Sequence, residues 1–296
     1  MNILLATDGS TFSDEAAAFL ACFEFTPRDT IHIFHVVSAV PYEDDYRQQV
    51  LQAIKRISPK ILRSCENAMK STKAVLESEE GQGVPEDEIV KKASDLAVDL
   101  IVMGARGVRG VKSLFLGSVT RAVSAMADTP VLVTKPGGKT CGPLRVLFAS
   151  DGSGAAETTA DMLARLPCPR GSALTILNIA WSGFSDIPDR YAMEINDAMK
   201  GELARMRAAE NVQAETIVNH ARERLAGRFA EVHGLVKGGD PAEEVLKTAE
   251  EMQADLIAIG SRGLKGVKGM LGSVSRRVLG RAPCSVLAGK ERASKT

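Results

Sequence analysis

Short apolar runs alternate with longer amphipathic segments along the 296-residue chain. In the first half, the apolar runs lie near residues 2–7, 30–37, 73–79, 100–103 and 131–134. Runs of this length are typical of strands that are buried on both faces of a parallel sheet. The segments between them have helical periodicity, and the alternation of strand and helix predicts an open, doubly wound α/β sheet. Such a sheet binds ligands outside the carboxyl ends of its strands, where the strand order reverses.

Helix-start signals agree with this prediction. Residues 11–14 (TFSD) resemble the start of a helix with a capping side chain and an acidic first turn. Pro85 is followed by three acidic residues, which suit the positive end of a helix dipole, and Pro241 opens a matching segment in the second half. We therefore expect helices to begin at these positions.

The second half of the chain repeats the first. Three stretches return in the same order: 3–10 as 146–153, 99–107 as 255–263, and 116–121 as 271–276. Each half also ends in a short apolar run, at 131–133 and 286–288. Three colinear matches do not arise by chance, so we predict two Rossmann-like domains, each a five-stranded parallel sheet with helices on both faces. Domain 1 is expected to cover residues 1–137, a Gly/Pro-rich linker 138–142, and domain 2 residues 143–292.

The two copies differ in length at two places. The offset between matching residues is 143 at Asp8 and Asp151 but 156 at Gly104 and Gly260, so the second half carries 13 additional residues, which we place in 181–227. The polar segment 189–228 is interpreted as one or two amphipathic helices with a solvated charged face, and partner docking is the alternative. The other difference is one residue fewer in a glycine-rich segment of the second half.

Composition and charge narrow the function classes. The chain has 37 Lys and Arg against 37 Asp and Glu, with 45% hydrophobic residues, which are ordinary values for a globular protein. A generic nucleic-acid binder or a polybasic membrane-surface protein needs excess positive charge, so both are disfavoured. No apolar stretch approaches the ~18 residues of a membrane span, and the N-terminus lacks the basic region of a signal peptide. A cytoplasmic protein is therefore expected.

Catalytic and metal-binding signals are weak. The chain has five cysteines without CxxC or Cys/His spacing, which predicts reduced thiols rather than a disulfide framework: Cys22, Cys65, Cys141, Cys168 and Cys284. Its four histidines also lack metal-ligand spacing, and His32 and His35 are expected to be packed in or beside a strand. Neither a GxSxG elbow nor a cysteine paired with a nearby histidine is found. The sequence thus indicates no dedicated enzyme, although slow nucleotide hydrolysis stays open.

The strongest chemical signal is a glycine pattern that follows a predicted strand and leads into a predicted helix. Two residues separate Gly104 from Gly107, nine separate Gly107 from Gly117, and Ser118 follows. Glycine lets the backbone approach a phosphate closely, and unpaired N–H groups at a helix start favour an anion. Neighbouring side chains add hydroxyl donors and positive charge suited to a polyphosphate: Ser118, Thr120, Arg106, Arg109 and Lys112.

Asp8 ends the first predicted strand at the same edge of the sheet. Because a carboxylate repels phosphate, we expect it to accept a hydrogen bond from ribose hydroxyls or a base, and the alternative is that it caps the turn at Thr11.

Two motifs that resemble other nucleotide-binding motifs carry less weight. Residues 110–113 lack the glycine that a P-loop has before its lysine, and residues 152–157 have Glu157 where a dinucleotide fingerprint has its third glycine.

These motifs resemble those of the universal stress protein family in its tandem two-domain form, over nearly the whole chain. The family's nucleotide motif is glycine, two residues, glycine, nine residues, glycine, then serine or threonine, and the first half reproduces it. The resemblance implies a fold of the adenine nucleotide alpha hydrolase type and ATP, ADP or AMP as ligand, with Mg²⁺ compatible with the phosphates. Asp8 and Val36 would lie near the adenosine. The site residues that it implies in the first half are Thr7, Asp8, Val36, Met103, Gly104, Arg106, Gly107, Gly117, Ser118, Val119 and Thr120.

The second half departs from the motif at one point. The matching residues there are Asp151, Ile179, Gly260, Gly263, Gly272, Ser273 and Val274. Only eight residues separate Gly263 from Gly272, which would shift every following N–H group unless the loop tightens. Gly266 and Gly269 supply flexibility for such tightening. We expect weaker, altered or absent nucleotide binding in this half.

The resemblance also implies that the last strands of the two domains pair across a pseudo-two-fold axis. The chain would then be an intrachain pseudo-dimer, which is also compatible with a homodimer. The leading hypothesis is a nucleotide-binding stress-response regulator, in which ATP occupancy changes the surface offered to a protein partner. A nucleotide-independent scaffold protein and a slow ATPase are the alternatives, and neither nucleic acid nor a membrane is expected as a partner.

Overall fold

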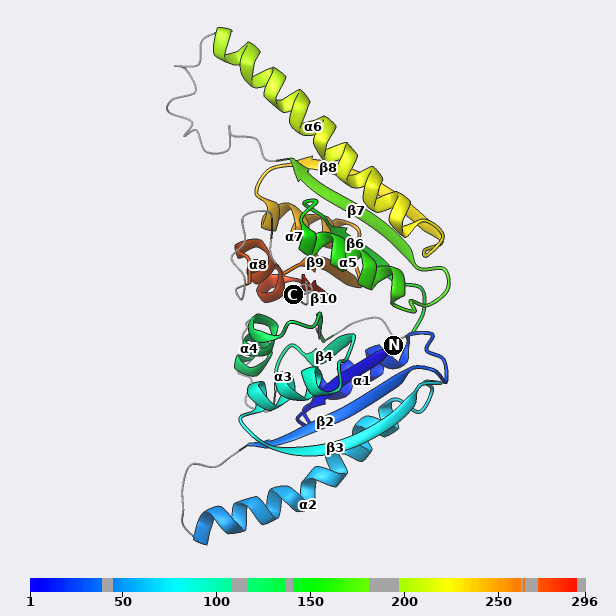
Figure 1. Cartoon of the computed structure of the whole chain (residues 1–296), viewed down its shortest axis with the longest axis vertical. Helices are drawn as coiled ribbons and strands as arrows, with labels where there is room; N and C mark the ends of the chain where they lie inside the picture. The colour runs from blue at the N-terminus through cyan, green and yellow to red at the C-terminus, as the bar shows by residue number, and fades with distance from the viewer. Residues whose placement is uncertain are drawn as a thin grey trace.

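The computed structural model describes residues 1–38, 45–107, 116–136, 141–180, 197–261, 263 and 271–291. In both halves strands and helices alternate strictly (Figure 1). The first half contains β1 (Asn2–Thr7), α1 (Thr11–Ala21), β2 (Thr30–Ser38), α2 (Asp45–Ala68), β3 (Val75–Gly83), α3 (Pro85–Asp95), β4 (Leu100–Gly104), α4 (Ser118–Met126) and β5 (Val131–Thr134). The second half contains β6 (Arg145–Ala149), α5 (Gly154–Arg165), β7 (Ala173–Ala180), α6 (Asp197–Leu225), β8 (Glu231–Gly238), α7 (Pro241–Glu251), β9 (Leu256–Gly260), α8 (Ser273–Arg281) and β10 (Ser285–Gly289). The predicted helix starts at Thr11, Pro85 and Pro241 are confirmed.

The strands form a single sheet in the order β3-β2-β1-β4-β5-β10-β9-β6-β7-β8. Neighbours within each half are parallel, so each half is the doubly wound, five-stranded sheet that the alternation predicts. The strand order reverses at β1 in the first half and at β6 in the second, which places the expected ligand edge beside these strands. β5 and β10 pair antiparallel with Val133 opposite Val286, and this confirms the pairing of the last strands in an intrachain pseudo-dimer.

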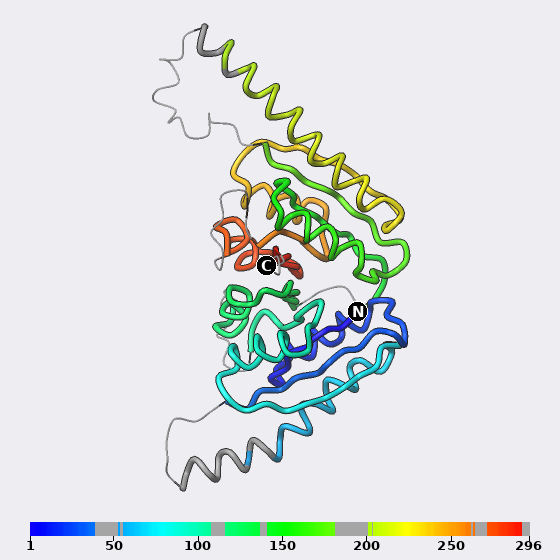
Figure 2. The backbone as a smooth tube through the Cα atoms, viewed as in Figure 1, coloured from blue at the N-terminus to red at the C-terminus, as the bar shows by residue number. Residues whose placement is uncertain are grey.

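Helices cover both faces of the sheet, and each face has a hydrophobic core that runs through both halves. On one face, α1, α2, α5 and α6 contribute buried residues such as Leu20 and Leu163 to a single cluster. On the other face, α3, α4, α7 and α8 do the same with residues such as Val123 and Val278. Neither core stops at the β5–β10 junction, so the halves form one packed body with one half at each end of its long axis (Figures 1 and 2).

The sheet edges and the long helices depart from the expected pattern. β3 is an edge strand that begins at Val75 rather than residue 73, and most of its residues are exposed, so the prediction of strands buried on both faces is wrong here. Its acidic side chains, among them Glu77 and Glu79, hinder pairing with another chain. α6 has 29 residues against 24 in α2, so part of the insertion lengthens this helix. No helix in the described part of the chain is long and apolar enough to cross a membrane.

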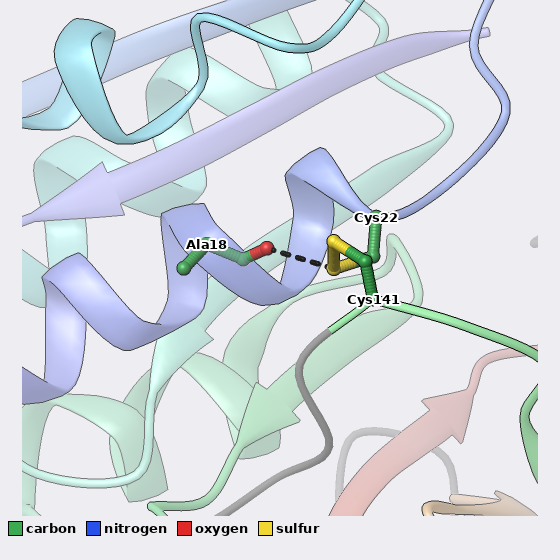
Figure 3. The surroundings of a disulfide bond; sticks show 3 residues. All are labelled: Ala18, Cys22 and Cys141. Carbon is green, nitrogen blue, oxygen red and sulfur yellow. Dashed lines mark hydrogen bonds between the residues drawn. A yellow bond between two sulfur atoms is a disulfide. The ribbon is translucent and has the colours of Figure 1, made fainter.

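A disulfide joins Cys22, the C-cap residue of α1, to Cys141 in the segment between the halves (Figure 3). The prediction of reduced thiols is therefore wrong for this pair, whose Cα atoms lie 4.8 Å apart although 119 positions separate them in sequence. Tertiary folding alone brings them together, because β2 to β5 all lie between them in the sequence. Cys65, Cys168 and Cys284 are free, and burial raises the pKa of each thiol to about 12.

Candidate functional site

In each half an aspartate follows the strand at which the sheet order reverses. Asp8 Oδ1 accepts a hydrogen bond from the backbone N–H of Ser10, and Asp151 Oδ1 accepts one from Ser153, both at 3.0 Å. The glycine between them, Gly9 or Gly152, has a positive φ of 74° or 73°. Ser10 and Ser153 then cap α1 and α5. Asp8 thus caps the turn before α1, as the alternative predicted, and Ser10 is the N-cap residue of the helix itself.

The other carboxylate oxygen of each aspartate lies against the second glycine of the motif. A Cβ atom on Gly107 would overlap Asp8 Oδ2, and a Cβ atom on Gly263 would lie 2.8 Å from Asp151 Oδ2. The first glycine has a different neighbour, because a Cβ atom on Gly104 would lie 2.7 Å from the carbonyl oxygen of Phe12 in α1. Glycine is therefore required at both positions, because a Cβ atom there would clash with other atoms of the protein. The close approach at the second glycine places an aspartate carboxylate beside the glycine loop.

The third glycine closes the loop at the start of a helix. The N–H of Gly117 donates to the carbonyl of Ala105 at 2.9 Å, and that of Gly272 donates to Ser261 at 2.7 Å. The helix start is thus anchored alike in both halves, which agrees with the tightened loop that the sequence left open rather than with a shift of the following N–H groups. The difference in loop length is taken up in 106–116 and 262–271, most of which lies outside the described residues, as do Arg109, Lys112, Gly266 and Gly269.

The first turns of α4 and α8 lack the features that neutralise other helix starts in this protein. Gly117 and Gly272 are their N-cap residues, no side chain among the described residues caps either helix, and neither first turn contains an acidic residue. By contrast, side chains of Ser10, Ser153 and Asp240 cap α1, α5 and α7. The N–H groups of an uncapped first turn and the helix dipole both favour an anion. The described residues of α4 and α8 therefore suit a phosphate.

Thr120 does not play the role that its sequence position indicated. Its side chain is buried, and its hydroxyl donates to the carbonyl of Gly104 at 2.9 Å. Ser275, the matching residue of α8, donates in the same way to Gly260 at 2.6 Å. In this arrangement each hydroxyl proton is used within the protein, so Thr120 and Ser275 have none to donate to a phosphate. Ser118 stays at the start of α4, as expected.

A cavity of about 340 Å³ opens at the carboxyl edge of the second half. All seven residues predicted for this half line it: Asp151, Ile179, Gly260, Gly263, Gly272, Ser273 and Val274. Sequence reasoning missed the remaining lining residues, Ala149, Ser150, Asn178, Pro241, Val245, Ile259 and Ser275. The start of a helix at Pro241 was visible in the sequence, but nothing there indicated that α7 forms a wall of the site.

The first half brings its predicted residues to the equivalent edge with some differences. Thr7 and Met103 are buried, and the Thr7 hydroxyl donates to Ser13 Oγ at 3.1 Å, so these two residues support the site from within the core. Val36 and Val119 are partly buried against the core on the α3–α4 face. The guanidinium of Arg106 lies over the Phe12 ring, 5.4 Å from its centroid. This contact fixes a positive charge beside the glycine loop.

The histidines of the first half are held by protein partners. His35 Nδ1 lies 2.8 Å from the carbonyl oxygen of Thr7, to which it donates, and His32 contacts Asn2 and Glu77. The described residues contain no group of three or more His, Cys, Asp or Glu side chains that could hold a metal ion. The helix starts of α4 and α8 suit an anionic group, and the carboxylates of Asp8 and Asp151 suit a hydroxylated part of the same ligand.

Comparison with known proteins agrees with this arrangement. A family model described as the universal stress protein family matches residues 1–135 and again 144–290. A universal stress protein of Mycolicibacterium smegmatis is 27% identical, with 98% of this chain and 97% of that protein covered. Universal stress protein YxiE of Bacillus subtilis is 29% identical, with 48% of this chain and 96% of that protein covered. The crystal structure of a universal stress protein from Archaeoglobus fulgidus covers 98% of both chains with a TM-score of 0.66 and 26% identity.

Proposed function

The chain belongs to the universal stress protein family, and from this premise we propose that it binds an adenine nucleotide at the carboxyl edge of each half and acts as a stress-response regulator rather than a dedicated enzyme. ATP is the leading ligand, with ADP and AMP as its shorter relatives. The nucleotide occupies the cavity beside Asp151 in the second half and the equivalent place beside Asp8 in the first.

The observation that carries this proposal is the helix start at the edge of the cavity. Gly272 and Ser273 line the cavity, and they begin a helix that has no acidic residue in its first turn and no cap from a described side chain. Phosphate oxygens accept hydrogen bonds from such N–H groups and are stabilised by the helix dipole. In the first half, Arg106 adds a charge that Phe12 holds in place. The phosphates therefore lie over the starts of α4 and α8.

The adenosine part of the nucleotide fits the other lining residues. A cavity of about 340 Å³ is at the lower end of the range for small-molecule sites, roughly 300–1,000 Å³. Ile179, Val245 and Ile259 give it apolar walls for a base, and Asp151 offers a carboxylate that accepts hydrogen bonds from ribose hydroxyls. With no acidic cluster in the described residues, Mg²⁺ would be held mainly by the phosphates.

A bound nucleotide would regulate this protein by changing the surface that it offers to a partner. Ser118 and Ser273, the first residues of α4 and α8, are exposed at the molecular surface, so a nucleotide bound over them alters the face that a partner protein meets. We place the two regulatory units at residues 1–137 and 143–292, joined by the linker 138–142. A homodimer would bring four such sites together.

The test begins with the nucleotide content of the purified full-length protein. Denaturing extraction followed by mass spectrometry should release an adenine nucleotide, and calorimetry on the stripped protein should detect ATP binding. No adenine nucleotide in the extract, together with no binding at millimolar ATP, would overturn the proposal in favour of a nucleotide-independent scaffold. ATP turnover that disappears in Asp8→Ala while binding is retained would overturn the assignment as a regulator without dedicated catalysis.

A further inference from the structure

We propose that Thr120 and Ser275 are positioning residues for the phosphates, which fix each helix start to the end of the preceding strand whatever the length of the loop between them. This inference rests on the proposed function. It assigns a role to two residues that do not themselves offer a donor to the ligand.

Two hydrogen bonds close each loop at its base. In the first half they run from the Gly117 N–H to Ala105 O, at 2.9 Å, and from the Thr120 hydroxyl to Gly104 O, at 2.9 Å. In the second half they run from the Gly272 N–H to Ser261 O, at 2.7 Å, and from the Ser275 hydroxyl to Gly260 O, at 2.6 Å. The same four residue positions are therefore joined in both halves, two by a backbone hydrogen bond and two by a hydrogen bond from a side-chain hydroxyl.

The hydroxyl bonds are protected from competing water. Thr120 and Ser275 are each only 3% exposed, so solvent cannot replace the lost partner if the hydroxyl is removed. The carbonyls of Gly104 and Gly260 stand at the ends of β4 and β9, which are buried over their whole length. A buried hydrogen bond to a rigid strand gives the helix start a fixed reference point.

The direction of these side chains keeps the helix start available. Thr120 and Ser275 are the third residues of α4 and α8, the position from which a capping-box side chain turns back to the N-cap residue. Here the hydroxyl reaches the strand instead, and glycine at the N-cap has no side chain with which to cap. The first turn is thus held in place without using its N–H groups. Preorganised donors of this kind bind an anion without a cost for ordering the helix start.

The comparison between the halves separates the hydroxyl from everything else that varies. One loop has nine residues between its last two glycines and the other has eight, yet both are closed by the same pair of bonds. The two side chains differ by a methyl group and share only the hydroxyl. The position of the phosphate-binding N–H groups is therefore set by these two closing bonds and not by the loop length, and the hydroxyl bond is the one that a side-chain substitution can remove.

The test compares ligands with and without phosphate. Thr120→Val combined with Ser275→Ala removes both hydroxyls, and Thr120→Ser combined with Ser275→Thr exchanges the residues of the two halves while keeping both hydroxyls. Calorimetry on the full chain measures the affinity for ATP and for adenosine in each variant. Loss of the hydroxyls should weaken ATP binding about five- to tenfold, which corresponds to about 1–1.4 kcal/mol, and should change adenosine binding less than about twofold. The exchanged variant should match the wild type for both ligands.

The outcomes distinguish this inference from the proposed function. Equal ATP affinity in the wild type and the hydroxyl-free variant would overturn the positioning role, as would an equal loss for ATP and adenosine, which indicates a merely structural role. Absence of ATP binding in the wild type would instead overturn the proposed function itself. Each single variant repeats the measurement with the other half intact, so a folding defect in the double variant does not stop the test.

Discussion

The disulfide between Cys22 and Cys141 leads to a quantitative prediction about stability. It closes a loop with a sequence separation of 119, which spans most of the first half from the end of α1 to the segment before β6. In the chain-entropy model, a cross-link over such a loop restricts the unfolded chain by about 5 kcal/mol at 25 °C. Because strain and residual structure reduce this effect, we expect reduction to lower the free energy of unfolding by about 2–5 kcal/mol.

The assay is urea unfolding of the full chain with and without a thiol reductant. The wild type should unfold at a clearly lower urea concentration when reduced. Cys22→Ser combined with Cys141→Ser should give the reduced midpoint under both conditions. Cys168→Ser is the matched control, because this thiol is free in the structure, and its response to reductant should equal that of the wild type.

Thiol counting gives the same prediction a second, independent readout. In denaturant without reductant, three of the five cysteines should react with a thiol reagent, and all five should react after reduction. In the native protein the free thiols Cys65, Cys168 and Cys284 should react slowly, because burial raises their pKa values to about 12 and thiolate is the reactive form. Five reactive thiols in unreduced, unfolded protein, or a urea midpoint that does not change with reductant, would contradict a stabilising disulfide between Cys22 and Cys141.

Three further changes test the site and the electrostatics. Gly117→Ala should lower the number of tight ATP sites per chain from two to one, as measured by calorimetry, because its Cβ atom would lie 3.4 Å from the nearest described protein atoms yet occupy the approach of the phosphate. Gly280→Ala in α8 is its control and should leave binding unchanged, because the added Cβ meets no described atom within 4 Å. Burial raises the pKa of Asp99, but hydrogen bonds from the Asn2 N–H and from Arg165 outweigh this effect and hold the pKa below its usual 3.8. The resulting stabilisation is present above pH 3.8 and is lost as the pH falls through the folded-state pKa, so melting temperatures should fall less steeply in acid for Asp99→Asn than for the wild type.

Local and repeating features of this fold were predictable from sequence, because short apolar strands and helix-start residues leave signals at fixed spacing. The doubling of the motif predicted two similar sheets, and the last strands pair as the family resemblance implied. The exposure of β3 was not predictable, because an edge position depends on which strands lie beside it. The link between Cys22 and Cys141 was missed for a related reason, since it depends on contacts between segments far apart in sequence.

The candidate site, too, was predictable from sequence only in part. The glycine spacing identified the residues that gather around the second-half cavity, because loop and helix start are consecutive in sequence. It could not show which atoms the glycines approach, and Gly107 is needed beside the carboxylate of Asp8 rather than beside a phosphate alone. Nor could the glycine spacing show that the Thr120 hydroxyl donates to the carbonyl of Gly104, because that hydrogen bond joins a helix and a strand across a loop.

The number of nucleotides bound per chain is the decisive measurement for nucleotide binding. Equilibrium dialysis of the stripped, full-length protein against labelled ATP counts the nucleotides bound per chain at saturation. We expect two, one over the start of α4 and one over the start of α8, because both loops are closed by the same hydrogen bonds. No bound ATP at millimolar concentration would contradict nucleotide binding by this protein.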